Sequence, residues 1–66
     1  MRVVANGRPY EVSDGLSVAS FVRERGLDPK YVVVEHNGEA LERGRYDEVL
    51  LAEGDRLELV RAVAGG

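Results

Sequence analysis

The fold is decided by residues 16–27, Leu16-Ser17-Val18-Ala19-Ser20-Phe21-Val22-Arg23-Glu24-Arg25-Gly26-Leu27, which carry the start, the apolar face and the end of one helix. Ser17 is a typical N-cap residue, because its hydroxyl can accept a hydrogen bond from an amide of the first turn. Apolar side chains then recur at the i, i+3, i+4 spacing of an amphipathic helix: Val18, Phe21 and Val22. Gly26 falls where a helix commonly ends, and Pro29 prevents the helix from resuming. The sequence therefore predicts one short helix over residues 18–25.

Strand patterns lie on both sides of this helix. Before it, two short segments flank Asn6-Gly7, a pair typical of a tight type I′ hairpin. After it, a β-branched run ends at Asn37-Gly38, a polar connection follows, and the last segment alternates apolar and polar residues. The predicted strands are residues 1–5, 8–12, 31–36, 40–41 and 56–61, with 31–36 expected to be largely buried. In the polar connection, we expect Tyr46 to close one end of the core.

This order of elements predicts an α+β fold with two layers. We expect a mixed sheet of four to five strands with one helix across one face, and with the first and last strands side by side. That arrangement is a β-grasp. Residues 1–62 would form the single β-grasp domain, and residues 63–66 a flexible reactive tail.

Composition excludes several classes of function. The chain has 66 residues, 44% of them hydrophobic and 32% charged, with a formal net charge of −3. Nucleic-acid-binding domains are usually basic, so nucleic acid is an unexpected partner. No apolar run approaches the ~20 residues that cross a bilayer, and no signal peptide is evident, so we expect a cytoplasmic protein without membrane contact and a monomer when free. Two acidic pairs are candidates for steering basic partners: Glu53 with Asp55, and Asp47 with Glu48.

No catalytic constellation is evident. The chain has no Cys and one His, His36, which we interpret as an ordinary strand-end histidine. No ligand spacing points to a metal, no glycine pattern points to a bound phosphate, and no serine has an activating base in the pattern. We therefore expect neither a metal nor a bound cofactor, and a protein that is not itself an enzyme.

The closing residues, Val63-Ala64-Gly65-Gly66, are the candidate functional site. Glycine has no Cβ, so a Gly-Gly end is thin enough for a narrow channel and leaves the carbonyl carbon of Gly66 uncrowded. An ionised carboxylate is a poor acyl donor and has to be activated, for which a partner enzyme would use ATP. Four extended residues would reach ~13 Å at ~3.3 Å each. We expect Gly65, Ala64, Val63 and Val60 to contact that partner, on the sheet face away from the helix.

The chain resembles the thiamine-biosynthesis sulfur carrier proteins, a family with the ubiquitin-like β-grasp fold. The resemblance covers essentially the whole chain and rests on Asn37-Gly38-Glu39-Ala40-Leu41, Arg45-Tyr46-Asp47-Glu48-Val49-Leu50-Leu51, Glu53-Gly54-Asp55-Arg56-Leu57-Glu58-Leu59-Val60 and Val63-Ala64-Gly65-Gly66. It implies that an E1-like enzyme adenylates Gly66 with ATP and that a desulfurase supplies sulfur. The resulting thiocarboxylate would donate its sulfur to thiazole synthase, with the chain acting as a recycled co-substrate.

Three alternatives remain at this point. One is a passive binding module, in which the final residues are incidental; deleting Gly66 would leave such a module working and would abolish a carrier. The small subunit of molybdopterin synthase shares the Gly-Asp turn and the Gly-Gly end, although the absence of proline and aromatic residues in Leu59-Val60-Arg61-Ala62-Val63 favours the thiamine carriers. A ubiquitin-like protein modifier would join Gly66 to a lysine of another protein. Isopeptide adducts that survive boiling in reductant would distinguish such a modifier from a carrier.

Overall fold

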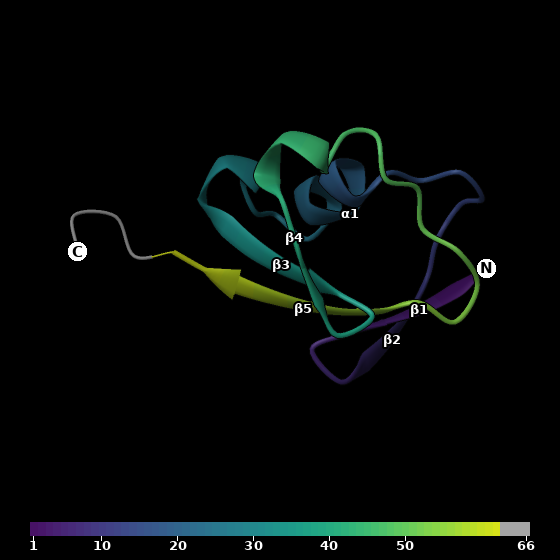
Figure 1. Ribbon diagram of the computed structural model, residues 1–66. Helices are drawn as coiled ribbons and strands as arrows, with labels where there is room; N and C mark the ends of the chain where they lie inside the picture. Colours follow the sequence, from purple (N-terminus) through teal and green to yellow (C-terminus); the bar gives the residue numbers. More distant parts are fainter. Residues whose placement is uncertain (63–66) are drawn as a thin grey trace.

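The computed structural model describes residues 1–62, which form a five-stranded sheet with one α-helix across it (Figure 1). The strands are β1 (Arg2–Ala5), β2 (Arg8–Glu11), β3 (Val32–His36), β4 (Glu39–Leu41) and β5 (Arg56–Arg61), the helix is α1 (Val18–Glu24), and two 3-10 turns are η1 (Pro29–Tyr31) and η2 (Arg43–Arg45). All five predicted strands are present. Tyr31 belongs to η1 rather than to a strand, because the Asp28 side chain accepts a 2.9 Å hydrogen bond from the Lys30 amide and starts a turn there.

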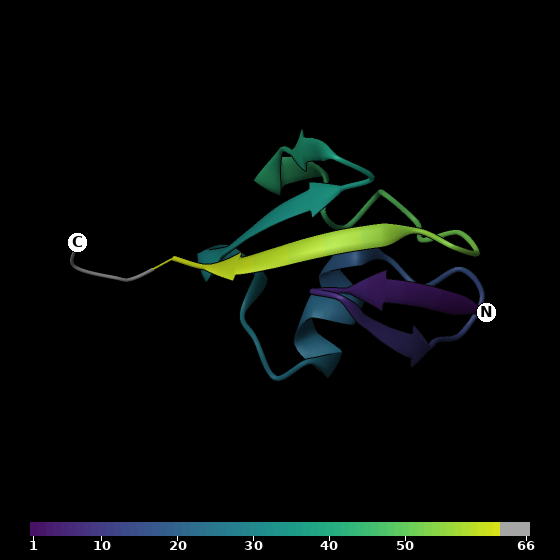
Figure 2. The ribbon, with the colours of Figure 1, turned by 90° about the horizontal axis from the view of Figure 1, so that it is seen from below.

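The order of strands in the sheet is β2-β1-β5-β3-β4. The first and last strands, β1 and β5, lie side by side and are parallel, whereas the other neighbours are antiparallel. Figure 2 shows the strands in front of α1, so the helix covers one face of the sheet and leaves the other face open. The predicted α+β fold, a mixed sheet with one helix across it, is confirmed.

Both ends of α1 form as the sequence predicts. Ser17 is the N-cap, and its hydroxyl oxygen accepts a hydrogen bond from the Ser20 amide at 3.1 Å. At the other end Gly26 has a φ of 77°, and the Leu27 amide donates to the Val22 carbonyl at 3.2 Å, which is the bonding of a Schellman motif. The helix ends at Glu24, one residue before the predicted end, because the next residue serves as the C-cap.

The two Asn-Gly turns also fasten the last strand. Asn6 and Asn37 both have positive φ, at 51° and 52°, as type I′ turns require. The Asn6 side chain accepts from the Leu59 amide at 2.8 Å and donates to the Leu59 carbonyl at 3.2 Å. The Asn37 side chain accepts from the Arg56 amide at 2.8 Å. Each turn therefore supplies β5 with hydrogen bonds that its neighbouring strands leave unmade.

The core lies between the sheet and α1. It is built from inward-facing residues of three strands, the apolar face of the helix and the loop after β4: Val3, Ala5, Val18, Ala19, Phe21, Val22, Val32, Val34, Tyr46, Leu51, Leu57 and Leu59. The expectation that the strand at 31–36 is largely buried is wrong. Val32 and Val34 are buried, but Val33 and Glu35 are exposed, because the helix covers only one face of β3.

Tyr46 closes the end of the core as predicted, and its hydroxyl makes hydrogen bonds to the backbone of β3. The side chain is 3% exposed. Its hydroxyl donates to the Val32 carbonyl at 2.8 Å and accepts from the Val34 amide at 3.1 Å. Since β4 pairs with β3 only from Val34 to His36, the tyrosine satisfies backbone groups at the point where β4 ends.

The expectation that Asp55 lies on an acidic rim with Glu53 is wrong, because Asp55 is only 8% exposed. Its carboxylate accepts from the Ala52 amide at 2.8 Å and from the Asn37 side chain at 3.1 Å, and it lies 2.9 Å from His36 Nε2. Burial raises the pKa of Asp55, but the hydrogen bonds and the charge of His36 outweigh burial and lower the pKa below its ordinary value. This carboxylate therefore joins two turns of the fold.

We predict that Tyr46→Phe destabilises the protein by about 1–3 kcal/mol, because it leaves two buried backbone groups of β3 without a partner. Tyr31→Phe is the matched control: Tyr31 is 50% exposed, and its hydroxyl can be replaced by hydrogen at little cost. Urea unfolding of the two variants and the wild type measures the difference. Equal stability of the two variants would contradict the role assigned to the Tyr46 hydroxyl.

We predict that Asp55 makes the stability of the fold depend on pH in acid. Because its pKa is lowered in the fold, its contribution is fully present above the ordinary pKa and is lost as the pH falls through the lowered value. The free energy of unfolding of Asp55→Asn should therefore fall less steeply than that of the wild type between about pH 5 and pH 2. Asp14→Asn, at a side chain that is 93% exposed, should keep the wild-type slope. If the free energy of unfolding of Asp55→Asn fell as steeply with pH as that of the wild type, ionised Asp55 would not stabilise the fold.

Candidate functional site

The candidate site begins where β5 leaves the sheet. Four of the predicted site residues, Val63, Ala64, Gly65 and Gly66, lie outside the described residues 1–62. The fifth, Val60, is on β5 and is 59% exposed. Its exposure agrees with the sequence interpretation, whereas its contact with a partner stays a prediction.

The last strand is held along its whole length up to the base of the tail. On one side β5 pairs with β3 from His36↔Leu57 to Val32↔Arg61. On the other side it pairs with β1 at its start and with the Asn6 side chain further on. Beyond the strand, the Ala62 amide still donates to the Tyr31 carbonyl at 2.7 Å. The sheet therefore fixes the position and direction of the chain as far as Ala62.

The open face of the sheet has an apolar pair close to this exit. Val33 and Val60 are directly opposite each other on β3 and β5, and they are 45% and 59% exposed. The next outward pair along the same two strands is Glu35 and Glu58, both exposed. Like charges that face each other across a sheet repel. The open face thus combines an apolar pair with two facing carboxylates.

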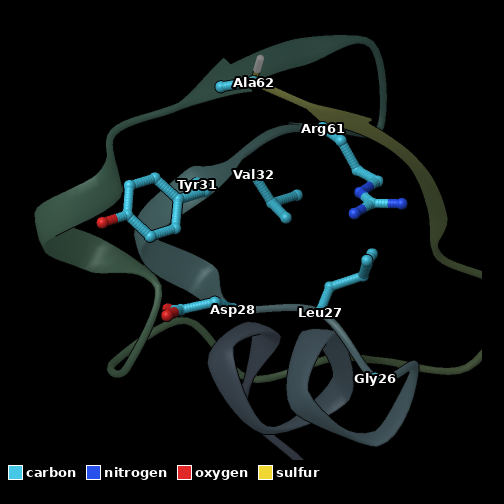
Figure 3. Close-up of a pocket in the computed structure, with 7 residues that line it drawn as sticks. All are labelled: Gly26, Leu27, Asp28, Tyr31, Val32, Arg61 and Ala62. Carbon is cyan, nitrogen blue, oxygen red and sulfur yellow. The ribbon is translucent and has the colours of Figure 1, made fainter. Parts of the chain in front are cut away.

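A groove lies on the opposite side of β5, toward the helix. It has a volume of about 690 Å³ and is lined by Gly26, Leu27, Asp28, Tyr31, Val32, Arg61 and Ala62; we call it the tail-base groove. In Figure 3 the Arg61 side chain extends from β5 toward Leu27, and the Tyr31 ring forms another wall. Sequence reasoning missed this groove, because its walls come from two segments that only the β3 to β5 pairing brings together.

Several polar residues that were candidates for function make contacts within the fold. Ser17 caps α1 and shares a 3.1 Å hydrogen bond with the Ser20 hydroxyl, and His36 contacts Asp55. Of the other expected acidic pair, Asp47 lies 3.9 Å from the Arg23 guanidinium and Glu48 lies 3.0 Å from that of Arg45. Steering by that pair stays a prediction.

Among residues 1–62, no group of three or more histidine, aspartate or glutamate side chains is placed to hold a metal ion. Over the same residues, no helix has the length and apolar character needed to cross a membrane.

The arrangement defines the class of protein. A mixed five-stranded sheet crossed by one helix, with the last strand parallel to the first and leading out to the carboxyl end of the sequence, is the ubiquitin-like β-grasp. The ThiS family model matches residues 3–66, and the chain belongs to that family. The resemblance to the thiamine-biosynthesis sulfur carriers is therefore confirmed.

Solved structures support this assignment over the whole chain. The crystal structure of the thiamine biosynthesis protein ThiS from Geobacter metallireducens has 33% sequence identity to this chain and a TM-score of 0.83, and the match covers both chains completely. The solution structure of a thiamine biosynthesis protein from the same organism has 33% identity and a TM-score of 0.80, with 88% of that chain covered.

Curated relatives are longer proteins. The chain is 35% identical over 66 residues to the thiazole synthase of Paramagnetospirillum magneticum and 33% identical to that of Magnetococcus marinus. Both matches cover all of this chain and 20% of the relative, so the chain spans about a fifth of the length of these proteins.

We predict that Glu58→Gln raises the free energy of unfolding by about 0.2–1 kcal/mol at low salt, because it removes one of the two facing charges on the open face. The gain should shrink in 1 M salt, where the screening length falls to about 3 Å. Glu42→Gln, at an exposed glutamate that makes no capping hydrogen bond to η2, is the control and should change stability little. A loss of stability in Glu58→Gln would show that Glu58 has a favourable partner within the fold.

Proposed function

We propose that this chain is a sulfur carrier protein for thiazole formation, with the carboxyl group of Gly66 as the site that carries sulfur. It acts as a co-substrate that partner enzymes load and unload, and it is not itself an enzyme. The family membership over residues 3–66 is the observation that carries this proposal. The structure adds a body that holds the chain in place up to Ala62.

The relatives support thiazole synthase as the partner that receives the sulfur. Proteins of that name contain a segment alignable with the entire chain. Two domains in one polypeptide meet at a high effective concentration. Because those proteins contain a segment similar to this chain, we infer that this chain also contacts thiazole synthase directly.

The chemistry requires activation of Gly66. A free α-carboxyl group has a pKa of about 3.3–3.7, so it is ionised near neutral pH and resists attack at its carbonyl carbon. An E1-like enzyme would let a carboxylate oxygen attack the α-phosphate of ATP, which releases pyrophosphate and leaves an acyl-adenylate. A cysteine persulfide of a desulfurase then attacks the carbonyl carbon and AMP leaves. A second thiol reduces the resulting acyl disulfide, which releases the thiocarboxylate and forms a disulfide between the two thiols.

The folded body would serve as the recognition surface for these enzymes. The Val33–Val60 pair is exposed, and Val60 lies on the strand that Val63, Ala64 and Gly65 follow in the sequence. Burying such an apolar pair contributes roughly 25 cal/mol per Å² of apolar surface. We place this cycle in the cytoplasm, where ATP would be available to the activating enzyme.

We predict that the chain gains one sulfur in exchange for one oxygen when it is incubated with an E1-like activating enzyme, a desulfurase, cysteine, a reducing thiol and ATP. Intact-mass analysis measures the exchange, and fragmentation assigns it to Gly66. A chain synthesised with Gly66 as an amide should gain nothing, because an amide nitrogen replaces the oxygen that attacks ATP.

Matched controls separate the reactive end from the fold. A synthetic chain with a free carboxyl group should behave as the biological one. Gly44→Ala should also be loaded normally, since a Cβ at Gly44 meets no other atom within 4 Å. Loading of the amide would refute Gly66 as the acyl site. Stable isopeptide adducts in place of a thiocarboxylate would identify a protein modifier.

A further inference from the structure

We propose that the tail-base groove receives an acidic segment of the activating enzyme, with Arg61 as the residue that pairs with its carboxylate. This inference rests on the proposed function, because it assigns a second contact surface to the first enzyme of that cycle. It concerns the helix side of β5, whereas Val60 points to the open side.

The walls of the groove are held in place by hydrogen bonds of the fold. Leu27 is the last residue of the Schellman motif of α1, and Tyr31 ends η1, so both are fixed by local hydrogen bonds. The 2.7 Å bond between the Ala62 amide and the Tyr31 carbonyl joins this wall to the end of β5. Together the walls present apolar surface with a guanidinium at one edge, as Figure 3 shows. A volume of about 690 Å³ has room for several side chains of a partner.

The charge of the groove differs from that of the whole chain. The formal net charge is −3, yet Arg61 extends over the groove and has no ion pair within residues 1–62. The only acidic group in the lining, Asp28, accepts a hydrogen bond from the Lys30 amide. The Lys30 ammonium itself lies 6.0 Å from the Tyr31 ring. Arg61 and the neighbouring Lys30 therefore outnumber the one carboxylate of the lining, Asp28.

These features specify the chemistry of the occupant. A guanidinium binds a carboxylate through two parallel N–H donors, and it stays charged at every physiological pH. The neighbouring apolar walls favour an aliphatic or aromatic side chain beside that carboxylate. A segment with an acidic residue next to an apolar one therefore fits, whereas a basic segment would be repelled by Arg61 and Lys30.

The activating enzyme is the better candidate for this contact. In the thiazole synthase relatives, the matched segment shares a polypeptide with the rest of the protein, so contacts within that protein need little affinity. An activating enzyme is a separate protein in both arrangements, whether the carrier segment is fused to the synthase or not, so it always has to be bound from solution. It also has to hold the carboxylate about 3–3.5 Å from its target on ATP, which a contact on each side of β5 would secure.

The test measures the KM of the activating enzyme for the carrier, from pyrophosphate release at increasing concentrations of the whole chain. We expect Arg61→Glu to raise KM at least about tenfold, as the loss of a desolvated charge pair does. The kcat should change little, because Arg61 stands five residues before Gly66 in the sequence and takes part in no bond that changes during adenylation. Arg61→Lys should give an intermediate KM, and Tyr31→Ala, which removes an exposed apolar wall, should also raise it.

Arg8→Glu is the matched control, with the same change of charge at an exposed arginine on β2, which β1 separates from β5. An unchanged KM in Arg61→Glu, or an equal rise in Arg8→Glu, would overturn the assignment of the groove. Calorimetry would measure the binding of Arg61→Glu to thiazole synthase. If the substitution weakened that binding and left the binding to the activating enzyme unchanged, the choice of partner would be overturned. A wild-type chain that releases no pyrophosphate with the enzyme would instead refute the proposed function.

Discussion

The structure depends on the backbone pairing of β5, which lies in the middle of the sheet and is also the last strand. A central strand has neighbours on both sides, so its amides and carbonyls are satisfied by β1, by β3 and by the side chains of Asn6 and Asn37. Inward residues of the same strand, Leu57 and Leu59, are part of the core. The chain therefore leaves the body from one of its most firmly held elements, and movement of the body is passed directly to the base of the tail.

That placement reconciles two opposite demands on a carrier. A partner enzyme gains affinity from a rigid body, since fewer groups have to be ordered on binding. A reacting end at Gly66, as proposed above, has to be thin and free of side chains, which glycine provides at a high cost in conformational entropy. The sequence separates the two demands, because the alternating pattern of Arg56–Arg61 gives way to Gly65 and Gly66 within five residues of the end of β5.

Local sequence signals predicted most of the fold. Ser17, Gly26 and the two Asn-Gly pairs each act within a few residues, so their effects on the backbone can be inferred from the sequence alone. Features that depend on distant segments could not be inferred in the same way. Asp55 was expected on a charged surface and is buried beside His36, 19 residues away in the sequence. The tail-base groove and the facing glutamates likewise exist only once β3 and β5 are paired in the observed register.

The two sides of β5 differ in charge as well as in shape, and one strand produces both. Successive side chains of a strand point to opposite faces, so Glu58 and Val60 face the open side while Arg61 borders the groove on the helix side. The open side combines an apolar pair with repelling carboxylates, and the helix side combines apolar walls with a guanidinium. A partner that encloses the strand meets two facing carboxylates on the open side and the Arg61 guanidinium on the helix side. Such a pattern rejects a partner docked the wrong way round, because like charges would then face each other across the interface.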